Sequence, residues 1–224
     1  MSGRDSYFFR IATIFFTSLL YCAGAAAAHL PEVTPDGLHL VKQTDFGAVY
    51  LKPGAKFGQY DKVAVLECFV AFQHDWVQNM NVQMADSVTP DMVQHIKHAL
   101  AAQFMKVFKQ QLSDAGYAVV DDAARDVLVL RPAIIDLQVQ APDPMSQTGV
   151  VYSQGAGQGT LYLELYDSVS SELLGRVIDT EAAENVGGTF GYQDSTQNLV
   201  QADAILKKWA DRLVQFLKAA RGAG

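Results

Sequence analysis

Cysteine and positive charge are both scarce in this sequence of 224 residues. Its two cysteines are too few for a disulfide-stabilised scaffold or a multi-cysteine zinc module. The 17 basic residues stand against 24 acidic ones, and the net charge of −7 argues against a nucleic-acid-binding protein, which needs a clustered basic surface. Seven prolines and 17 glycines exclude a collagen or a proline-rich linker protein.

Established catalytic motifs are absent as well. The sequence contains no G-x-S-x-G, no Walker phosphate-binding loop, no H-E-x-x-H and no C-x-x-C. Each absence excludes only the enzyme families that use the motif. The sequence therefore assigns no catalytic, cofactor-binding or metal-binding residue. Half of the residues are hydrophobic and 18% are charged, a balance typical of a folded chain rather than a disordered one.

The first 28 residues have the three parts of a secretory signal peptide. Residues 1–10 carry two arginines and one aspartate, the run Ile11–Cys22 is uncharged and apolar, and residues 23–28 read AGAAAA. Signal peptidase requires small residues at positions −1 and −3, which the alanines supply. We expect cleavage after an alanine between Ala25 and Ala28, which would give a periplasmic or secreted protein.

Two other interpretations of this segment stay open. Residues 11–28 are 18 uncharged residues in a row, just long enough for an uncleaved membrane anchor, although their second half is mostly alanine. A lipoprotein would be cleaved before Cys22, but Tyr21 stands where the recognition motif has a small residue. Membrane association is therefore expected only if Cys22 is lipidated or the signal stays uncleaved.

The mature chain begins with turn signals. Removal of residues 1–28 changes the net charge from −7 to −8 and leaves one cysteine, Cys68, inside the apolar run VAVLECFVAF. We expect Cys68 to be buried and unreactive. Residues 29–60 contain several prolines and glycines and predict an extended amino-terminal arm with short strands at most. Residues 61–220 show no repeat or linker and predict a single domain.

Two amphipathic helices are predicted. Thr89 supplies a hydroxyl N-cap, Pro90 suits the first helical position and Gly116 suits the C-terminal end, so the first helix runs from about residue 90 to 115. Its apolar face includes Leu100 and Phe104. The second helix covers residues 196–220, and these residues form its apolar face: Leu199, Ala202, Ile205, Leu206, Trp209, Leu213, Phe216 and Leu217.

Strands are predicted on both sides of the first helix. Val63–Phe72 is almost continuously apolar, which indicates a strand buried on both faces, and the loop after it anchors Trp76 in the core. Residues 117–120 form a short strand. A longer strand covers residues 126–140, where Pro132 marks a bulge or a sheet edge.

The remaining strands suggest the architecture. Residues 160–166 and 173–182 flank a hairpin turn and should pair antiparallel. Two amphipathic helices need an apolar surface to cover, and a sheet with one covered face supplies it. The sequence therefore predicts an α/β two-layer sandwich, in which a mixed, mostly antiparallel sheet carries two helices on one face.

Glycines and histidines offer weak signals of binding sites. The glycine-rich stretches 149–159 and 187–191 look like phosphate-binding loops, but the first precedes a strand rather than a helix with free amides, and we interpret both as connections. His95 and His98 lie three apart on the first helix, with Asp91 as the one obvious third ligand. We interpret the two histidines as solvated. His74 and Asp75 are adjacent on an extended chain, where neighbouring side chains point apart.

Five charged residues fall in or near the predicted strands: Arg131, Asp136, Glu164, Asp167 and Arg176. They could form an acid–base site or cross-strand ion pairs, and we favour the pairs. The polar sheet face is the place where several charged groups could converge.

Four stretches together cover nearly the whole mature chain and carry a family resemblance: Pro35–Val63, Asp126–Asp143, Leu161–Asp179 and Ala202–Leu217 with Trp209. They resemble a bacterial family of exported proteins known only as a domain of unknown function, most of them described as lipoproteins. The resemblance implies a cell-envelope location and no assigned activity. Tyr21 departs from the family, whose members usually have a small residue before the lipidated cysteine.

Three functions are open. The first is an exported cell-envelope protein of unknown activity that acts as a non-enzymatic protein-binding or assembly component, which the signal, the missing motifs and the resemblance favour. The second is a periplasmic hydrolase with Asp136 and Glu164, which would need divergent pKa values. The third is a small-ligand carrier with a pocket between sheet and helices. We expect an envelope protein as partner, no nucleic acid and no cofactor.

Overall fold

The computed structural model describes residues 30–42, 44–84, 88–139, 152–153, 157–182, 191–192 and 195–222. The chain divides into two compact units, Met1–Leu30 and Pro31–Gly224, and every element below belongs to the second. The predicted signal peptide, Cys22 included, and most of both glycine-rich stretches lie outside the described residues.

The elements follow in this order along the chain: β1 (His39–Val41), β2 (Ala48–Leu51), β3 (Lys62–Val65), β4 (Phe69–Phe72), α1 (Trp76–Met84), α2 (Pro90–Asp114), β5 (Ala118–Val119), β6 (Val127–Gln138), β7 (Tyr152–Ser153), β8 (Gln158–Asp167), β9 (Leu173–Ala182), β10 (Gly191–Tyr192) and α3 (Ser195–Gly222). Among the described residues, no helix combines sufficient length with the apolar character that a bilayer-spanning segment needs.

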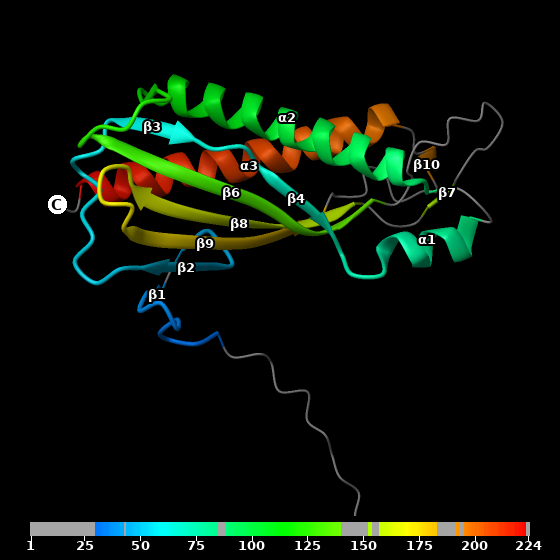
Figure 1. Cartoon of the computed structure of the whole chain (residues 1–224), viewed down its shortest axis with the longest axis horizontal. Coiled ribbons are helices and arrows are strands. Elements are labelled where there is room, and N and C mark those ends of the chain that lie inside the picture. The colour runs from blue at the N-terminus through cyan, green and yellow to red at the C-terminus, as the bar shows by residue number, and fades with distance from the viewer. Residues whose placement is uncertain are drawn as a thin grey trace, which may run out of the picture. The chain divides into compact units, whose positions relative to one another are not determined.

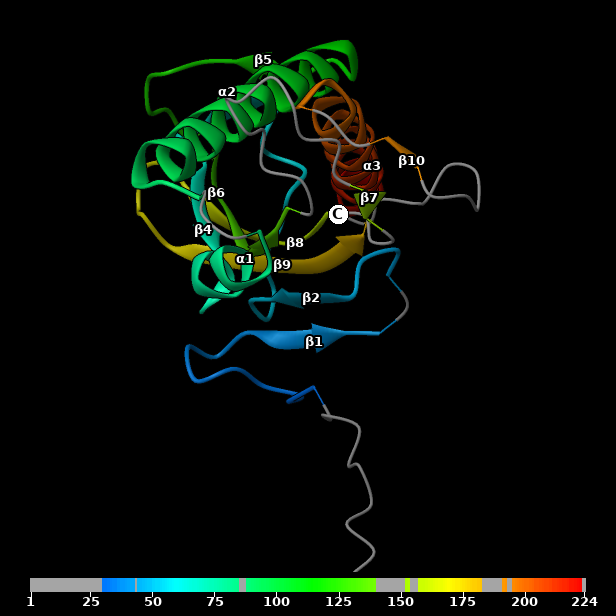
Figure 2. The same ribbon diagram turned by 90° about the vertical axis from the view of Figure 1, so that its right-hand side faces the viewer.

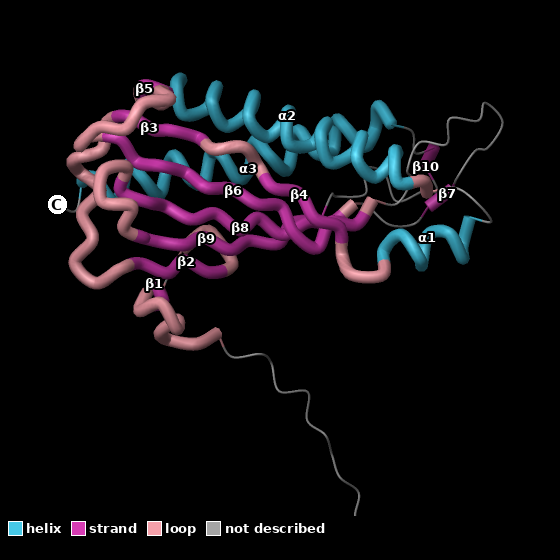
Figure 3. Tube along the Cα trace, in the orientation of Figure 1, coloured by secondary structure: helices cyan, strands magenta, loops and turns pink. Residues whose placement is uncertain are grey.

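One eight-stranded sheet organises the fold, in the order β1-β2-β9-β8-β6-β3-β5, with β4 also paired to β6. Neighbours from β1 to β6 are antiparallel, whereas β3 and β4 run parallel to β6 and β5 runs parallel to β3. Helices α2 and α3 lie side by side over one face of the sheet (Figures 1 and 2). The mixed, mostly antiparallel sheet with two helices on one face confirms the predicted architecture, and Figure 3 shows the two layers.

Helix α2 begins and ends where the sequence indicates. The hydroxyl of Thr89 accepts a hydrogen bond from the backbone N–H of Met92 at 3.3 Å, and Pro90 starts the helix. Gly116 follows the end with a φ of +91°, a left-handed conformation that glycine adopts without strain. Phe104 is fully buried and Leu100 packs against the core at partial exposure, so the predicted apolar face is confirmed.

The core lies between the sheet and the two helices. It joins Leu161, Leu163 and Leu165 of β8 to Phe104 of α2 and Trp209 of α3, all of them buried. Because one cluster contains side chains of both helices and of the central strands, each helix depends on the sheet for its buried surface.

The predicted strand Val63–Phe72 is wrong as a single buried strand. It is broken into β3 and β4, and Leu66 and Phe69 beside the break are exposed. The cause of the break is in β6, the strand with which β3 and β4 both pair. The carbonyl of Leu130 in β6 accepts a hydrogen bond from the N–H of Leu66. Because backbone groups two residues apart in a strand face the same neighbour, the backbone nitrogen of Pro132 also faces the side of β3 and β4. Pro132 has no N–H to donate, and the partner strand is interrupted there.

Pro132 itself is neither at a sheet edge nor at a bulge, contrary to the prediction. It pairs with Leu163 in the middle of the sheet, and the β6 irregularity falls later, between Ile135 and Gln138. A proline is tolerated in this central strand because the gap between β3 and β4 removes the need for its missing donor.

The segment predicted as an arm contributes to the sheet. Strand β2 pairs with β9 and β1 pairs with β2, so residues 39–51 extend the sheet on its antiparallel side. Strands β8 and β9 form the predicted antiparallel hairpin.

Helix α1 was not predicted, although the anchoring of Trp76 is confirmed. Trp76 is buried, stacks on Phe72 with ring centroids 4.2 Å apart, and donates to the carbonyl of Val139 at 3.2 Å. The preceding His74 and Asp75 do not point apart: Nε2 of His74 lies 3.2 Å from Oδ1 of Asp75. Asp75 has a φ of 63°, so the chain is turned rather than extended at this position.

Candidate functional site: the open face of the sheet

The two faces of strand β8 have opposite character. Its leucines point to the helices, and the alternate residues, Tyr162, Glu164 and Tyr166, belong to the other face. Across the strands, Arg131 of β6 pairs with Glu164, and Glu164 pairs with Arg176 of β9. We call this surface the open face, because α2 and α3 both lie on the opposite side.

Glu164 is the centre of a polar cluster on the open face. Only 9% of the residue is exposed. Its carboxylate accepts from Arg176 Nη2 at 2.9 Å, from the Tyr166 hydroxyl at 2.8 Å and from the Tyr162 hydroxyl at 3.4 Å. Nη1 of Arg131 lies 3.6 Å from the second carboxylate oxygen, too far for a hydrogen bond. The carboxylate is therefore satisfied by its neighbours, and it holds the tyrosines and Arg176 in place.

The amino-terminal segment covers one side of this cluster. Nη1 of Arg176 donates to Asp36 at 3.3 Å, and hydrogen bonding to Arg176 is the main cause that lowers the pKa of Asp36 from 3.8 to about 2. Leu38 is buried in a small apolar cluster with Ala48 and Tyr50 of β2. The amino-terminal segment, with Asp36 and Leu38, therefore covers the part of the open face that β2 and β9 form.

The other side of the open face carries exposed apolar side chains. Phe69 pairs with Ala133, which pairs with Tyr162, so Phe69 belongs to the same row of the sheet. Phe69 is 64% exposed and Leu66 is 46% exposed. The Arg131 side chain, which shares this face, is 64% exposed. We call Leu66, Phe69, Arg131 and Tyr162 the edge patch.

Three of the five strand charges, Arg131, Glu164 and Arg176, form ion pairs, as the sequence analysis favoured. The other two, Asp136 and Asp167, do not belong to this cluster. Asp136 is exposed, has a φ of 52° and lies five residues along β6 from Arg131, the partner of Glu164. This spacing corresponds to about 16 Å, well beyond the separation of carboxylates that cooperate in glycoside hydrolysis. Asp136 and Glu164 therefore do not form the acid–base pair of the hydrolase hypothesis.

Asp167 closes the hairpin between β8 and β9. Its carboxylate accepts from Ser170 N–H at 2.7 Å, from Val169 N–H at 3.0 Å and from the Tyr60 hydroxyl at 2.8 Å. The backbone bond from Ser170, followed by the bond from Tyr60, lowers the pKa of Asp167 to about 2. The hydrogen bonds of this residue stabilise a turn and do not involve Glu164.

The histidines of α2 lie at the surface and the cysteine lies in the interior. His95, His98 and Asp91 are exposed, and among the described residues no group of three His, Cys, Asp or Glu side chains could hold a metal ion. Cys68 is buried as expected, and its burial raises the pKa of its thiol to about 12.

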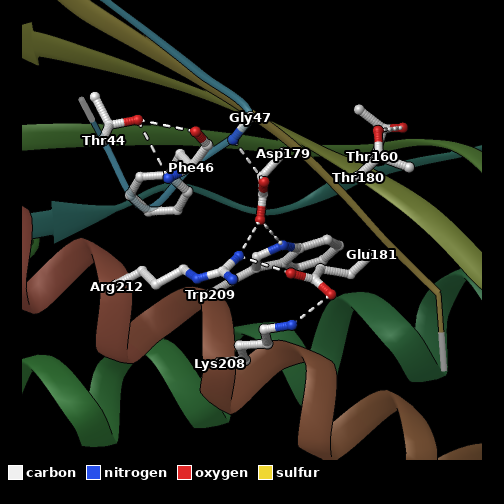
Figure 4. A network of polar contacts seen from close by, with 10 residues as sticks. All are labelled: Thr44, Phe46, Gly47, Thr160, Asp179, Thr180, Glu181, Lys208, Trp209 and Arg212. Atoms are coloured by element: carbon white, nitrogen blue, oxygen red, sulfur yellow. Dashed lines mark hydrogen bonds and ion pairs between the residues drawn. The ribbon is translucent and has the colours of Figure 1, made fainter. Parts of the chain in front are cut away.

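Sequence reasoning missed a second polar network, which joins α3 to the sheet (Figure 4). Asp179 of β9 is 6% exposed. It accepts from Trp209 Nε1 at 3.0 Å, from Arg212 Nη1 at 2.6 Å and from Gly47 N–H at 2.8 Å. Glu181 accepts from Arg212 and from Lys208, both at 2.7 Å.

A signal for this network was present in the pattern of β9. Val177, Asp179 and Glu181 alternate, so the two acids share the face of a buried valine, where a carboxylate requires a partner. Burial alone would raise the pKa of Glu181, but the bonds from Lys208 and Arg212 hold it below its ordinary value.

An open hollow also lies beside α3. It is lined by these residues: Asp45, Ala204, Lys207, Lys208, Asp211, Arg212 and Gln215. Lys207 is paired with Asp203, and Lys208 and Arg212 with Glu181. Most of its lining side chains are charged or polar, and none of them belongs to the apolar core between sheet and helices, where the small-ligand carrier hypothesis placed a pocket.

Comparison with known proteins shows to which family the chain belongs. Residues 36–213 match the family described as "Protein of unknown function (DUF3313)". The chain belongs to the DUF3313 family. The expected resemblance to a domain of unknown function is therefore confirmed, and membership assigns no activity and no site residue. No curated protein matches the chain.

Three solved structures show distant likenesses to the chain. A PelC dodecamer from Paraburkholderia phytofirmans is 17% identical, with a TM-score of 0.37, and the match covers 73% of this chain and 95% of that one. A leucine-to-methionine variant of that same protein gives a TM-score of 0.36, also at 17% identity, over 74% of this chain and 95% of that chain. A neuraminyllactose-binding hemagglutinin homolog from Helicobacter pylori is 12% identical, with a TM-score of 0.33 over 75% and 91%. Likenesses this distant say nothing of what the present chain binds.

Proposed function

We propose that this DUF3313 protein is exported to the cell envelope and acts there as a non-enzymatic component that binds another protein through the open face of its sheet. The observation that carries the proposal is the edge patch. Phe69 and Leu66 expose large apolar side chains, and arginine and tyrosine lie beside them on the same face. Aromatic residues and arginine are the side chains that contribute most to binding in protein interfaces.

The chemistry of the cluster supports binding rather than catalysis. Glu164 is the most buried carboxylate on the open face, and it is held by Arg176 and two tyrosine hydroxyls. A general acid or base needs an accessible group with a tuned pKa, within reach of a substrate proton. A carboxylate whose lone pairs are already occupied instead fixes neighbouring side chains in one conformation, which lowers the entropic cost of docking a partner.

Export is the other half of the proposal, and residues 1–28 support it by their charged, apolar and small-residue parts. Because Tyr21 disfavours cleavage before Cys22, the mature protein should begin after an alanine between Ala25 and Ala28 and carry no lipid. Fractionation and intact mass test this: the expected result is an unmodified periplasmic chain. A membrane-bound chain with diacylglycerol on Cys22, or with residues 1–28 intact, would contradict it. Tyr21→Ala should convert part of the protein to the lipidated form.

Binding is tested by capture from envelope extract under matched substitutions. Phe69→Lys places a charge in the edge patch, and Val169→Lys does the same in the β8–β9 turn, where Val169 is 61% exposed. The proposal expects one envelope protein that the wild type and Val169→Lys retain and Phe69→Lys loses. Capture that is equal for all three proteins, or absent, would contradict it.

A further inference from the structure

We infer that the turn Thr34–Leu38 is a latch on the open face, which opens so that a carboxylate of the partner takes the place of Asp36 on Arg176. This inference rests on the proposed function and names one chemical group of the partner. It follows from the hydrogen bonds within the turn, from the small apolar cluster beneath it, and from the two carboxylates that share Arg176.

The turn is held together by its own hydrogen bonds. The hydroxyl of Thr34 accepts from the N–H of Leu38 at 3.0 Å, and the N–H of Thr34 donates to the carbonyl of Leu38 at 2.8 Å. The N–H of Gly37 donates to the carbonyl of Thr34 at 2.9 Å, and Gly37 has a φ of +81°, which glycine adopts without strain. Each of these bonds joins two residues of the turn and does not depend on the sheet. The turn can therefore move as a unit.

A small apolar cluster and an ion pair fasten the turn to the sheet. Leu38 is buried with Ala48 and Tyr50 in a cluster that is separate from the main core. The ion pair joins Asp36 to Arg176, and the Asp36 side chain is 39% exposed. The strand that follows the turn, β1, is the terminal strand of the sheet (Figure 2). Segments with few buried apolar contacts open locally without global unfolding, so the turn can open while the main core stays intact.

Arg176 lies between two carboxylates. Its Nη2 donates to Glu164 at 2.9 Å, and its Nη1 donates to Asp36 at 3.3 Å. When Asp36 leaves, Arg176 and the buried Glu164 still hold each other, so opening leaves neither charge unpaired. Nε of Arg176 is buried and has no acceptor among the described residues, so the guanidinium has a further donor beyond those that the two carboxylates use.

The surface beneath the latch is continuous with the edge patch. The guanidinium carbon of Arg176 lies over the ring of Tyr162, 5.2 Å from its centroid, and Tyr162 belongs to the edge patch. Asp36 holds Arg176 in the free protein because the tether of the chain keeps its local concentration high. A partner bound at Phe69 would hold its own carboxylate near Arg176 in the same way. One carboxylate then replaces another, and Arg176 keeps two partners throughout.

The first experiment measures native-state hydrogen exchange on the full chain. The amide of Leu38 should exchange at least about tenfold faster than that of Leu163 in β8, after correction for intrinsic rates, because only Leu163 requires global unfolding. Asp36→Asn should speed exchange at Leu38 by a further factor of about three and leave Leu163 unchanged. Glu32→Gln is the control, since Glu32 pairs only loosely with Lys42, at 3.8 Å, and should change neither rate. Equal exchange at the two leucines, or no effect of Asp36→Asn, would overturn the latch.

The second experiment tests whether the surface beneath the latch accepts a carboxylate from another chain. The probe is the peptide EVTPDGLHL, which is residues 32–40 of this chain, and the control peptide is EVTPNGLHL. The full chain with Asp36→Asn and Leu38→Ala, which weaken its own latch, should bind the probe about tenfold more tightly than the control peptide. The wild type should bind the probe more weakly, because its own turn competes. Equal binding of the two peptides, or no binding, would overturn the inference. Asp36→Asn alone replaces the double variant if the latter does not fold.

The third experiment links the latch to the partner. In capture from envelope extract, Asp36→Asn should retain about three times as much of the Phe69-dependent protein as the wild type, because a larger fraction of the molecules is open. A purely structural contact would leave capture unchanged or lower it, and either result overturns the latch while Phe69-dependent capture still stands. Equal capture by the wild type and Phe69→Lys overturns the proposed function and, with it, the role of the latch in admitting a partner.

Discussion

Asp179 should contribute more to stability than any other polar residue of the helix–sheet interface. Replacement by alanine removes an acceptor from Trp209, Arg212 and Gly47 at once. The Trp209 indole is buried and would be left without its acceptor, which costs about 1–3 kcal/mol. Arg212 keeps its bond to Glu181 but loses its closest contact.

The expected loss in the free energy of unfolding is about 3–5 kcal/mol, the usual cost of removing one partner of a buried ion pair. Urea unfolding followed by tryptophan fluorescence measures it. Asp211→Ala is the matched control, because Asp211 is exposed on the same helix, and it should change the free energy by less than about 0.5 kcal/mol.

A double-mutant cycle identifies the responsible bond. In a Trp209→Phe background the indole donor is gone, so Asp179→Ala should cost less, and the two changes should deviate from additivity by about 1 kcal/mol or more. A loss below about 1 kcal/mol for Asp179→Ala alone would refute the view that this network fastens α3 to the sheet.

Three further predictions concern the core, the hairpin and the thiol. Phe104→Ala should lower the free energy of unfolding by about 3–5 kcal/mol, because the buried ring stacks on Phe108 at 3.8 Å; a loss under about 0.5 kcal/mol would contradict its burial. Asp167 has its pKa lowered from 3.8 to about 2, so its stabilising effect is complete above pH 4 and is lost as the pH falls toward 2. Asp167→Asn should flatten the pH dependence of urea unfolding over that range, and an unchanged profile would refute the assignment. Cys68 should resist a thiol reagent at about pH 8 without denaturant, and rapid labelling would overturn its burial.

Local signals were sufficient for the helices and the hairpin. Helix α2 is bounded by Thr89, Pro90 and Gly116, each of which acts on the backbone next to it. Helix α1 was not predicted because its sequence, WVQNMNVQM, is short and has no basic residue in its last turn. It also alternates apolar with amide side chains, which is not a helical pattern. Its existence depends on the tertiary packing of Trp76 and Met80 with Val88.

Long-range pairing explains what the sequence could not predict. The apolar run Val63–Phe72 gives no sign of a break, since the cause, Pro132, lies in another strand. The same holds for the polar clusters. Arg212 is 33 residues from Asp179, and Asp36 is 140 residues from Arg176, so only the sheet register brings them together. The convergence of charges on the polar face was foreseen, whereas the partner of each charge was not.

The edge patch shows the same limit. Period-two alternation places Arg131 and Glu164 on the polar face, but the exposure of Phe69 and Leu66 could not be read from a run that looks buried throughout. Phe69 is exposed because it lies on the sheet face that α2 and α3 leave uncovered, and which face is covered is a property of the whole fold.

The central claim, that another protein binds the open face at the edge patch, is tested most directly by photo-crosslinking in cells. A benzophenone amino acid replaces Phe69 in one strain and Val169, which has nearly the same exposure, in another. The account predicts a covalent adduct with one envelope protein from position 69 and none from position 169. No adduct at position 69, equal adducts at both positions, or an adduct only with a second copy of the chain would contradict it.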